Sequence, residues 1–145
     1  SAQSVAVADV DGDGDLDVLS ASILDNKLAW YENDGFQNFT ERIVTTDANG
    51  ARSVTTADFD NDGDVDIALA SANDNTFAWY ENDGNQNFTQ NVLTDSALAA
   101  RRVFVGDVNQ DGFVDVLGAA NLSDSITLFQ NRVETTDTLD GNPTF

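Results

Sequence analysis

One acidic nine-residue pattern occurs three times along the chain at a constant spacing. The pattern reads D-x-[DN]-x-D-G-x-x-D, and its copies begin at Asp9, Asp58 and Asp107, 49 residues apart. A fixed period of this size is typical of a solenoid or a propeller, in which each repeat is one structural unit. The sequence therefore predicts a repeat protein, and the acidic pattern indicates what each unit binds.

Each copy of the pattern is suited to calcium. It places side-chain oxygens at positions 1, 3, 5 and 9 and a glycine at position 6, where the chain must bend sharply. Position 7 is expected to offer its backbone carbonyl, so the phenylalanine in the third copy is acceptable there. We predict three Ca²⁺ sites, formed by Asp9, Asp11, Asp13, Asp15 and Asp17, by Asp58, Asp60, Asp62, Asp64 and Asp66, and by Asp107, Asn109, Asp111, Phe113 and Asp115.

Other interpretations of the pattern are weaker. An EF-hand needs a bidentate glutamate at position 12 and flanking helices, but position 12 is Ser20, Leu69 and Gly118 and the flanks resemble strands. A plain Asp/Gly-rich turn would explain one copy but not three in register. Magnesium prefers to keep its own waters and rarely occupies an all-protein cage. Calcium is therefore favoured.

The charge of the chain supports a bound cation. The three loops hold five, five and three carboxylates, which is 13 of the 26 acidic residues. Three divalent ions would change the formal net charge from −20 to −14. We therefore expect calcium binding to stabilise the fold. The third site should be the weakest, because Asn109 carries no charge.

Composition excludes several classes of function. The chain has no Cys, His or Met and only six basic residues. Disulfides, imidazole or thiolate metal sites and the usual catalytic triads are therefore absent, and we expect no enzymatic activity. An acidic surface repels nucleic acid, and no apolar run approaches the roughly 18 residues of a membrane span. Loops of this type suit millimolar calcium, so a secreted or cell-surface location is expected.

The repeat extends well beyond the acidic loop. The units cover residues 1–50, 51–99 and 100–145, the last including a tail at 133–145, and together form one propeller-type unit. Strand-like runs are predicted at 4–8, 16–22, 27–33 and 39–45, at 53–57, 65–71, 76–82 and 88–94, and at 102–106, 114–120 and 125–131. Short strands separated by frequent turns indicate an all-β fold. Four antiparallel strands per unit make a β-propeller blade.

The units resemble FG-GAP/VCBS-type repeats, which also form the calcium-loop blades of integrin α-subunit propellers. The resemblance rests on the acidic loop, on an aromatic strand ending in Asn-Asp-Gly (30–35 and 79–84), and on Asn-Phe-Thr (38–40 and 87–89). The literal FG and GAP segments are missing, so the VCBS branch fits better. The resemblance implies a calcium-stabilised, usually secreted and non-catalytic propeller that is often adhesive or associated with carbohydrate.

The third unit departs from the pattern after Asn131. Residues 132–137 resemble 42–47, which suggests a fourth strand after a shortened connection; alternatively, 140–145 resemble 83–88 and the chain stops as that strand begins. Three blades are too few for a ring, since propellers have about four to eight. We expect other copies or missing sequence to complete it. Two chains could make a six-bladed ring, or a non-closing contact could make a filament, and the tail could add a strand to a neighbour.

Other features leave further functions open. Trp30, Tyr31, Trp79 and Tyr80 could stack on sugars, although packing between blades is favoured because Leu128 and Phe129 replace them in the third unit. Glycan or cell-surface protein partners fit such a module. The N-glycosylation pattern occurs at Asn38, Asn87 and Asn121. An accessory module of a larger secreted enzyme is the remaining alternative.

Overall fold

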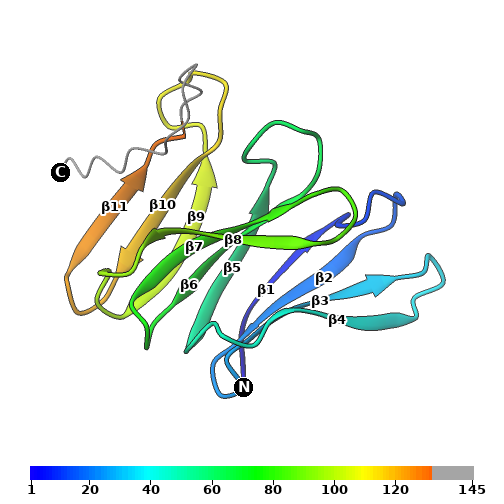
Figure 1. The fold of residues 1–145 in the computed structure, drawn as a ribbon, viewed down its shortest axis with the longest axis horizontal. Helices are drawn as coiled ribbons and strands as arrows, with labels where there is room; N and C mark the ends of the chain where they lie inside the picture. The colour runs from blue at the N-terminus through cyan, green and yellow to red at the C-terminus, as the bar shows by residue number, and fades with distance from the viewer. Residues whose placement is uncertain (132–145) are drawn as a thin grey trace.

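The computed structural model describes residues 1–131, which form eleven strands in three antiparallel sheets (Figure 1). The first sheet contains β1 (Ala2–Ala8), β2 (Asp17–Ser22), β3 (Lys27–Asn33) and β4 (Phe39–Thr45). The second contains β5 (Ala51–Ala57), β6 (Asp66–Ser71), β7 (Thr76–Asn82) and β8 (Phe88–Thr94). The third contains β9 (Ala100–Gly106), β10 (Asp115–Ala120) and β11 (Ser125–Phe129).

In each sheet the strands pair in sequence order, as in a propeller blade. The all-β prediction and the unclosed ring are confirmed. Two sheets have the predicted four strands, whereas the third has three within residues 1–131. Both readings of its fourth strand, and the tail at 133–145, fall outside the described residues. In the part of the chain that the structure describes, no helix is long and apolar enough to cross a membrane.

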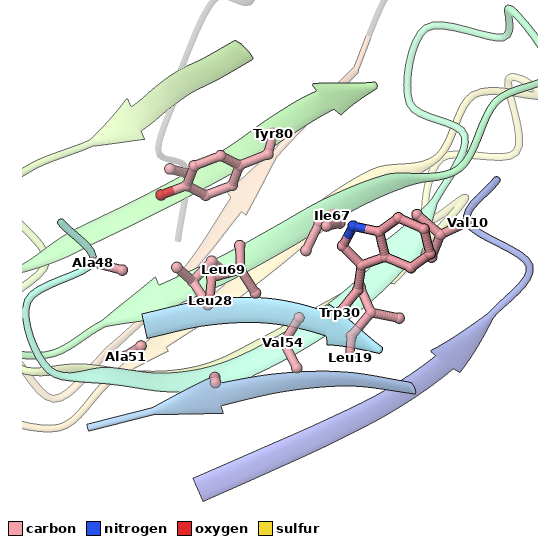
Figure 2. Packing of buried hydrophobic residues seen from close by; sticks show 12 residues of the cluster. Val10, Leu19, Leu28, Trp30, Ala48, Ala51, Val54, Ile67, Leu69 and Tyr80 are labelled. Carbon is pink, nitrogen blue, oxygen red and sulfur yellow. The ribbon is translucent and has the colours of Figure 1, made fainter. Parts of the chain in front are cut away.

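The three sheets are arranged side by side, and the strongest contacts between them are made by their first strands, β1, β5 and β9 (Figure 1). The first interface buries Leu19, Leu28 and Trp30 of the first sheet against Ile67 and Leu69 of the second (Figure 2). Because side chains alternate between the two faces of a strand, each sheet offers one face to the sheet before it and the other to the sheet after it.

The second interface repeats this arrangement with different side chains. Phe77 of the second sheet and Phe129 of the third pack edge to face, with ring centroids 6.0 Å apart. A side-chain carbon placed on Gly118 would lie 2.5 Å from the Phe77 ring, so glycine leaves the space that this ring fills. The second strand of each sheet is rich in small residues, which lets neighbouring sheets approach it on both faces.

Candidate functional site

The acidic loops join the first and second strands of each sheet, and their own carboxylates shape them. In the first loop, Asp9 accepts hydrogen bonds at 2.9 Å from the backbone N–H groups of Gly12 and Gly14. Asp13 accepts from the N–H of Asp15 at 2.8 Å. The equivalent bonds from Gly63 to Asp58 and from Gly112 to Asp107 recur in the other loops. The loop is thus wound around the carboxylate at position 1.

Two positions of each loop have left-handed backbone conformations. The glycine at position 6 has φ between 92° and 99° in all three copies. Position 4 also has positive φ, and it is occupied by Gly12, Asn61 and Gln110. Gly and Asn adopt this conformation readily. Gly12 and Asn61 therefore indicate the left-handed conformation at position 4 in the first two loops, whereas Gln110 does not indicate it in the third.

The aspartate at position 9 is fully buried in all three copies and ties each loop to the end of the third strand. Its side-chain oxygens accept hydrogen bonds from one backbone N–H in the loop and one at that strand end. The distances are 2.9 and 2.8 Å for Asp17 (from Val10 and Asn33), 2.9 and 2.8 Å for Asp66 (from Phe59 and Asn82), and 3.0 and 2.9 Å for Asp115 (from Val108 and Asn131). These residues were predicted as metal ligands, and the structure adds this role in the fold.

The first two loops each bring three carboxylates together. In each group, one oxygen from each residue lies within 4.8 Å of the others; the groups are Asp9, Asp11 and Asp17, and Asp58, Asp60 and Asp66. Asp13 and Asp62, the predicted ligands at position 5, lie outside these groups. Among residues 1–131, the third loop forms no such group of carboxylates; Asn109 replaces its second acid and donates to Asp111.

Among residues 1–131, no lysine or arginine forms an ion pair with these groups. Burial, together with the carboxylates of Asp60 and Asp62, raises the pKa of Asp66 to about 7, although two backbone hydrogen bonds oppose the shift. Burial also raises the pKa of Asp11, Asp17 and Asp60. A cation bound among these oxygens would favour their charged forms.

One atom in the second loop tests the fit to a metal directly. Asp58 Oδ1 is buried and has no hydrogen-bond partner in the described part of the chain. A buried carboxylate oxygen without a donor is costly. It belongs to a group that offers only oxygen ligands, the donor type that calcium and magnesium prefer. The residues therefore fit a hard divalent cation.

The side chain at position 7 does not point into these groups. Asp15 lies against the turn after the third strand, so that a side-chain carbon placed on Gly35 would be 2.5 Å from Asp15 Oδ2. In the second sheet, a side-chain carbon placed on Gly84 would likewise lie 2.5 Å from Asp64 Oδ2. This contact explains why glycine follows the aspartate of the Asn-Asp-Gly turn. The predicted metal contact of the position-7 carbonyl, including that of Phe113, stays a prediction.

The asparagine that ends the third strand in the first two sheets, and lies two residues beyond it in the third, was not predicted as a site residue. The Asn82 amide donates to the carbonyl of Val65 in its own sheet and to that of Val10 in the loop of the preceding sheet. The Asn131 amide reaches the Phe59 carbonyl in the same way. The Asn-Asp-Gly signature marks this position, but the contact across two sheets is not visible in a single repeat.

Other predicted residues have mainly structural contacts. Asn38, Asn87 and Asn121 are exposed. The amides of Asn38 and Asn87 donate to Asp34 and Asp83 at 2.8 and 2.9 Å, closing the turn before the fourth strand. Trp30 and Tyr80 are buried between the first two sheets and Trp79 packs against Phe59, as the packing interpretation expects. Tyr31 is the exception: it is half-buried outside this core, and its hydroxyl donates to Glu41 at 3.1 Å.

Comparison with known proteins identifies the repeat. The FG-GAP-like repeat family matches the chain twice, at residues 9–69 and 58–118, and each match spans two acidic loops. No curated protein matches the chain. Repeats of this family form β-propeller-like modules that are typically extracellular and generally serve structural or binding roles. With the matched residues covering most of its length, the chain belongs to the FG-GAP-like repeat family.

Proposed function

We propose that the chain is a calcium-binding, non-catalytic structural or adhesive module that acts outside the cell or at its surface. The observation that carries the proposal is the pair of three-carboxylate groups, each with one fully buried member, Asp17 or Asp66; the second group also contains the unpartnered Asp58 Oδ1. Family membership supports the structural role and the extracellular location.

Calcium fits these groups better than magnesium. Calcium tolerates irregular oxygen cages, whereas magnesium demands near-ideal octahedral geometry and keeps several waters. The loops supply closely spaced carboxylates on a backbone already fixed by hydrogen bonds to Asp9 and Asp58. The third loop supplies one carboxylate fewer at position 3, so its site is expected to be weaker.

Calcium titration of the metal-stripped protein tests the proposal. We expect heat of binding in a calorimeter and a melting temperature several degrees higher in calcium, because the ion binds only the folded loop. Asp60→Asn should weaken binding at the second loop by about tenfold or more, since it removes one charged ligand. An identical melt in calcium and in excess chelator would contradict calcium binding.

The matched control is Asp95→Asn. Asp95 is exposed and lies outside the three loops, so this variant changes the net charge equally without touching a predicted ligand. It should bind calcium like the unmodified chain. Equal loss of binding in both variants would mean that net charge, not the loop, governs the affinity.

A further inference from the structure

Within residues 1–131, the first and third sheets each have one face that no other sheet covers. The first-sheet face carries Val5, Val7, Val18, Ser20, Ala29 and Tyr31, and the third-sheet face carries Arg102, Phe104, Leu117, Ala119, Ile126 and Leu128. By the 49-residue period, the first-sheet face corresponds to the face that the second sheet presents to the first. The third-sheet face corresponds to the face that the second sheet presents to the third. The chain thus carries both halves of an interface that it already forms twice.

Exposure at equivalent positions shows what a further sheet would cover. Val5 is 67% exposed, whereas its equivalents Val54 and Val103 are 5% and 3% exposed. On the other face, Ile126 is 67% exposed, whereas both of its equivalents, Leu28 and Phe77, are 0% exposed. For Val5 the difference is the neighbouring sheet that covers Val54 and Val103. Ile126 differs from Leu28 and Phe77 also because these two residues pair with a fourth strand of their own sheet, whereas β11 is the edge strand within residues 1–131.

A specific hydrogen bond also repeats across each interface. Asn82 donates to the Val10 carbonyl of the preceding loop, and Asn131 donates to that of Phe59. The next acceptor in the series is the carbonyl of Val108, a residue that is half exposed although Val10 and Phe59 are buried. The first donor in the series is Asn33, whose amide donates only to Leu16 within residues 1–131.

The side chains facing each other would also fit. Phe77 packs over Gly118 at the second interface; at the equivalent positions of the new contact, the smaller Ile126 would meet Ser20. One hydrogen bond that crosses both existing interfaces would be missing from the new contact. At the two existing interfaces, the hydroxyls of Ser4 and Ser53 accept hydrogen bonds from the N–H groups of Val54 and Val103 at 3.2 Å. Arg102 occupies the equivalent position in the third sheet, and its side chain has no acceptor atom for the corresponding N–H group of the second copy.

We propose that the third-sheet face of one copy binds the first-sheet face of a second copy, with the Asn33 amide donating to the Val108 carbonyl of its neighbour. The contact rests on the proposed function in one respect, because Val108 belongs to the third calcium loop. The two surfaces differ, so the contact is heterologous: it closes a ring if the rotation allows and otherwise extends a chain. A ring buries both faces of every copy, and an open chain buries them in every copy except at its two ends.

Sedimentation of the calcium-loaded chain tests the contact. We expect a dimer or larger species, and an apparent dissociation constant about tenfold or more higher for Val5→Asp or Ile126→Asp, since each would bury an unpaired carboxylate. Both positions are exposed within one copy, so circular dichroism should show a folded monomer. A calcium-loaded chain that stays monomeric at high concentration would overturn the contact.

Ile43→Asp is the matched control for Val5→Asp. Ile43 lies opposite Ala29 and is 58% exposed, but its equivalent Val92 is 56% exposed even beside a neighbouring sheet. This variant should associate like the unmodified chain. A loss as large as that of Val5→Asp would show that added charge alone prevents association and would overturn the assignment.

Mixing the two face variants gives the sharpest test. Val5→Asp keeps an intact third-sheet face and Ile126→Asp keeps an intact first-sheet face, so the mixture should form a one-to-one dimer that neither variant forms alone. Failure of the mixture to associate would overturn the heterologous contact. Calorimetry on the same samples keeps the two proposals separate, because a monomer that still binds calcium leaves the proposed function standing.

Discussion

In the first two loops, the buried aspartate at position 9 is subject to forces that oppose one another. Its carboxylate satisfies two backbone N–H groups, and burial beside other carboxylates makes its charge unfavourable, as the raised pKa of Asp66 shows. A bound cation would offset the cost of the buried carboxylate charge and leave the two hydrogen bonds in place. Position 9 should therefore stabilise the fold with or without metal, whereas the acids at positions 3 and 5 should matter mainly when metal is bound.

Asp66→Ala should destabilise even the metal-free protein. It leaves the N–H groups of Phe59 and Asn82 without an acceptor, and each unsatisfied buried donor costs about 1–3 kcal/mol. The substitution also removes the repulsion between Asp66 and the neighbouring carboxylates, which offsets part of this cost. We therefore expect the free energy of unfolding to fall by about 2–4 kcal/mol. Urea denaturation in calcium-free buffer measures it. Asp62→Ala removes an exposed acceptor for a single N–H and is the control, with a small expected effect.

The metal-free protein should become more stable as the pH falls from about 7.5 to about 5. The folded-state pKa of Asp66 is raised to about 7, and those of Asp11, Asp17 and Asp60 are raised as well. In this window the folded state therefore binds more protons than the unfolded state, so the free energy of unfolding rises as protons are added.

Calcium should remove or reverse this pH dependence, because the bound ion favours the charged carboxylates with which protons compete. Urea midpoints at the two pH values, with and without calcium, make the comparison. Only below about pH 4 should the metal-free protein lose stability, as Asp34, Asp83 and Glu41, whose pKa values are lowered by side-chain hydrogen bonds, become protonated. A metal-free midpoint that rises with pH between 5 and 7.5 would contradict the assigned shifts.

Much of the strand pattern could be predicted from the sequence, because alternation and turn residues are local signals. The third and fourth strands of the first two sheets have the predicted bounds. The first strands begin two residues earlier than predicted, where a bulge at Ala2/Ser4 or Ala51/Ser53 lets the ladder continue. The second strands begin one residue later, at the buried aspartate, because the residue before it still belongs to the loop.

The ligand types and their spacing were also visible in the sequence, whereas contacts between repeats were not. Nothing within one repeat shows that Asn82 reaches the loop of the preceding sheet, or that the buried aspartate anchors the end of the third strand. The contact of Asn82 with the preceding loop depends on how sheets stack and links residues 72 positions apart. The contact of Asp66 with Asn82 lies within one repeat, but it joins residues 16 positions apart and so leaves no local signal.

The stacking of the sheets depends on small residues in their second strands, and Gly118 provides the sharpest case. Gly118→Ala places a side-chain carbon 2.5 Å from the Phe77 ring, so one of the two must move. Overpacking of this kind costs about 1–3 kcal/mol. Thermal or urea unfolding measures the loss, and Phe77→Leu in the same chain should recover part of it by making room.

Gly106→Ala is the control for this prediction. A side-chain carbon on Gly106 would meet no atom within 4 Å, and the residue does not have positive φ. Its stability should stay within about 0.5 kcal/mol of the unmodified chain. If both variants lose the same stability, the cause is the loss of a glycine from a strand and not the contact with Phe77.

The charge of the complete chain sets its response to salt. With 26 acidic and six basic residues, the folded chain concentrates negative charge that the unfolded chain spreads out. Raising sodium chloride from about 20 mM to about 300 mM shortens the screening length from roughly 20 Å to below 10 Å and weakens this repulsion. The melting temperature of the metal-free protein should therefore rise by several degrees over this range.

The calcium-loaded protein should respond less to salt, because three bound ions would already reduce the net charge from −20 to −14 and neutralise it where the carboxylates are densest. Sodium should also compete weakly for the loops and so offset part of the gain from screening. Calorimetric melts at both salt concentrations, with and without calcium, give the four values needed. If the repulsion lies within the acidic loops, salt should raise the melting temperature more without calcium than with it. Equal rises would show that the repulsion lies elsewhere on the surface.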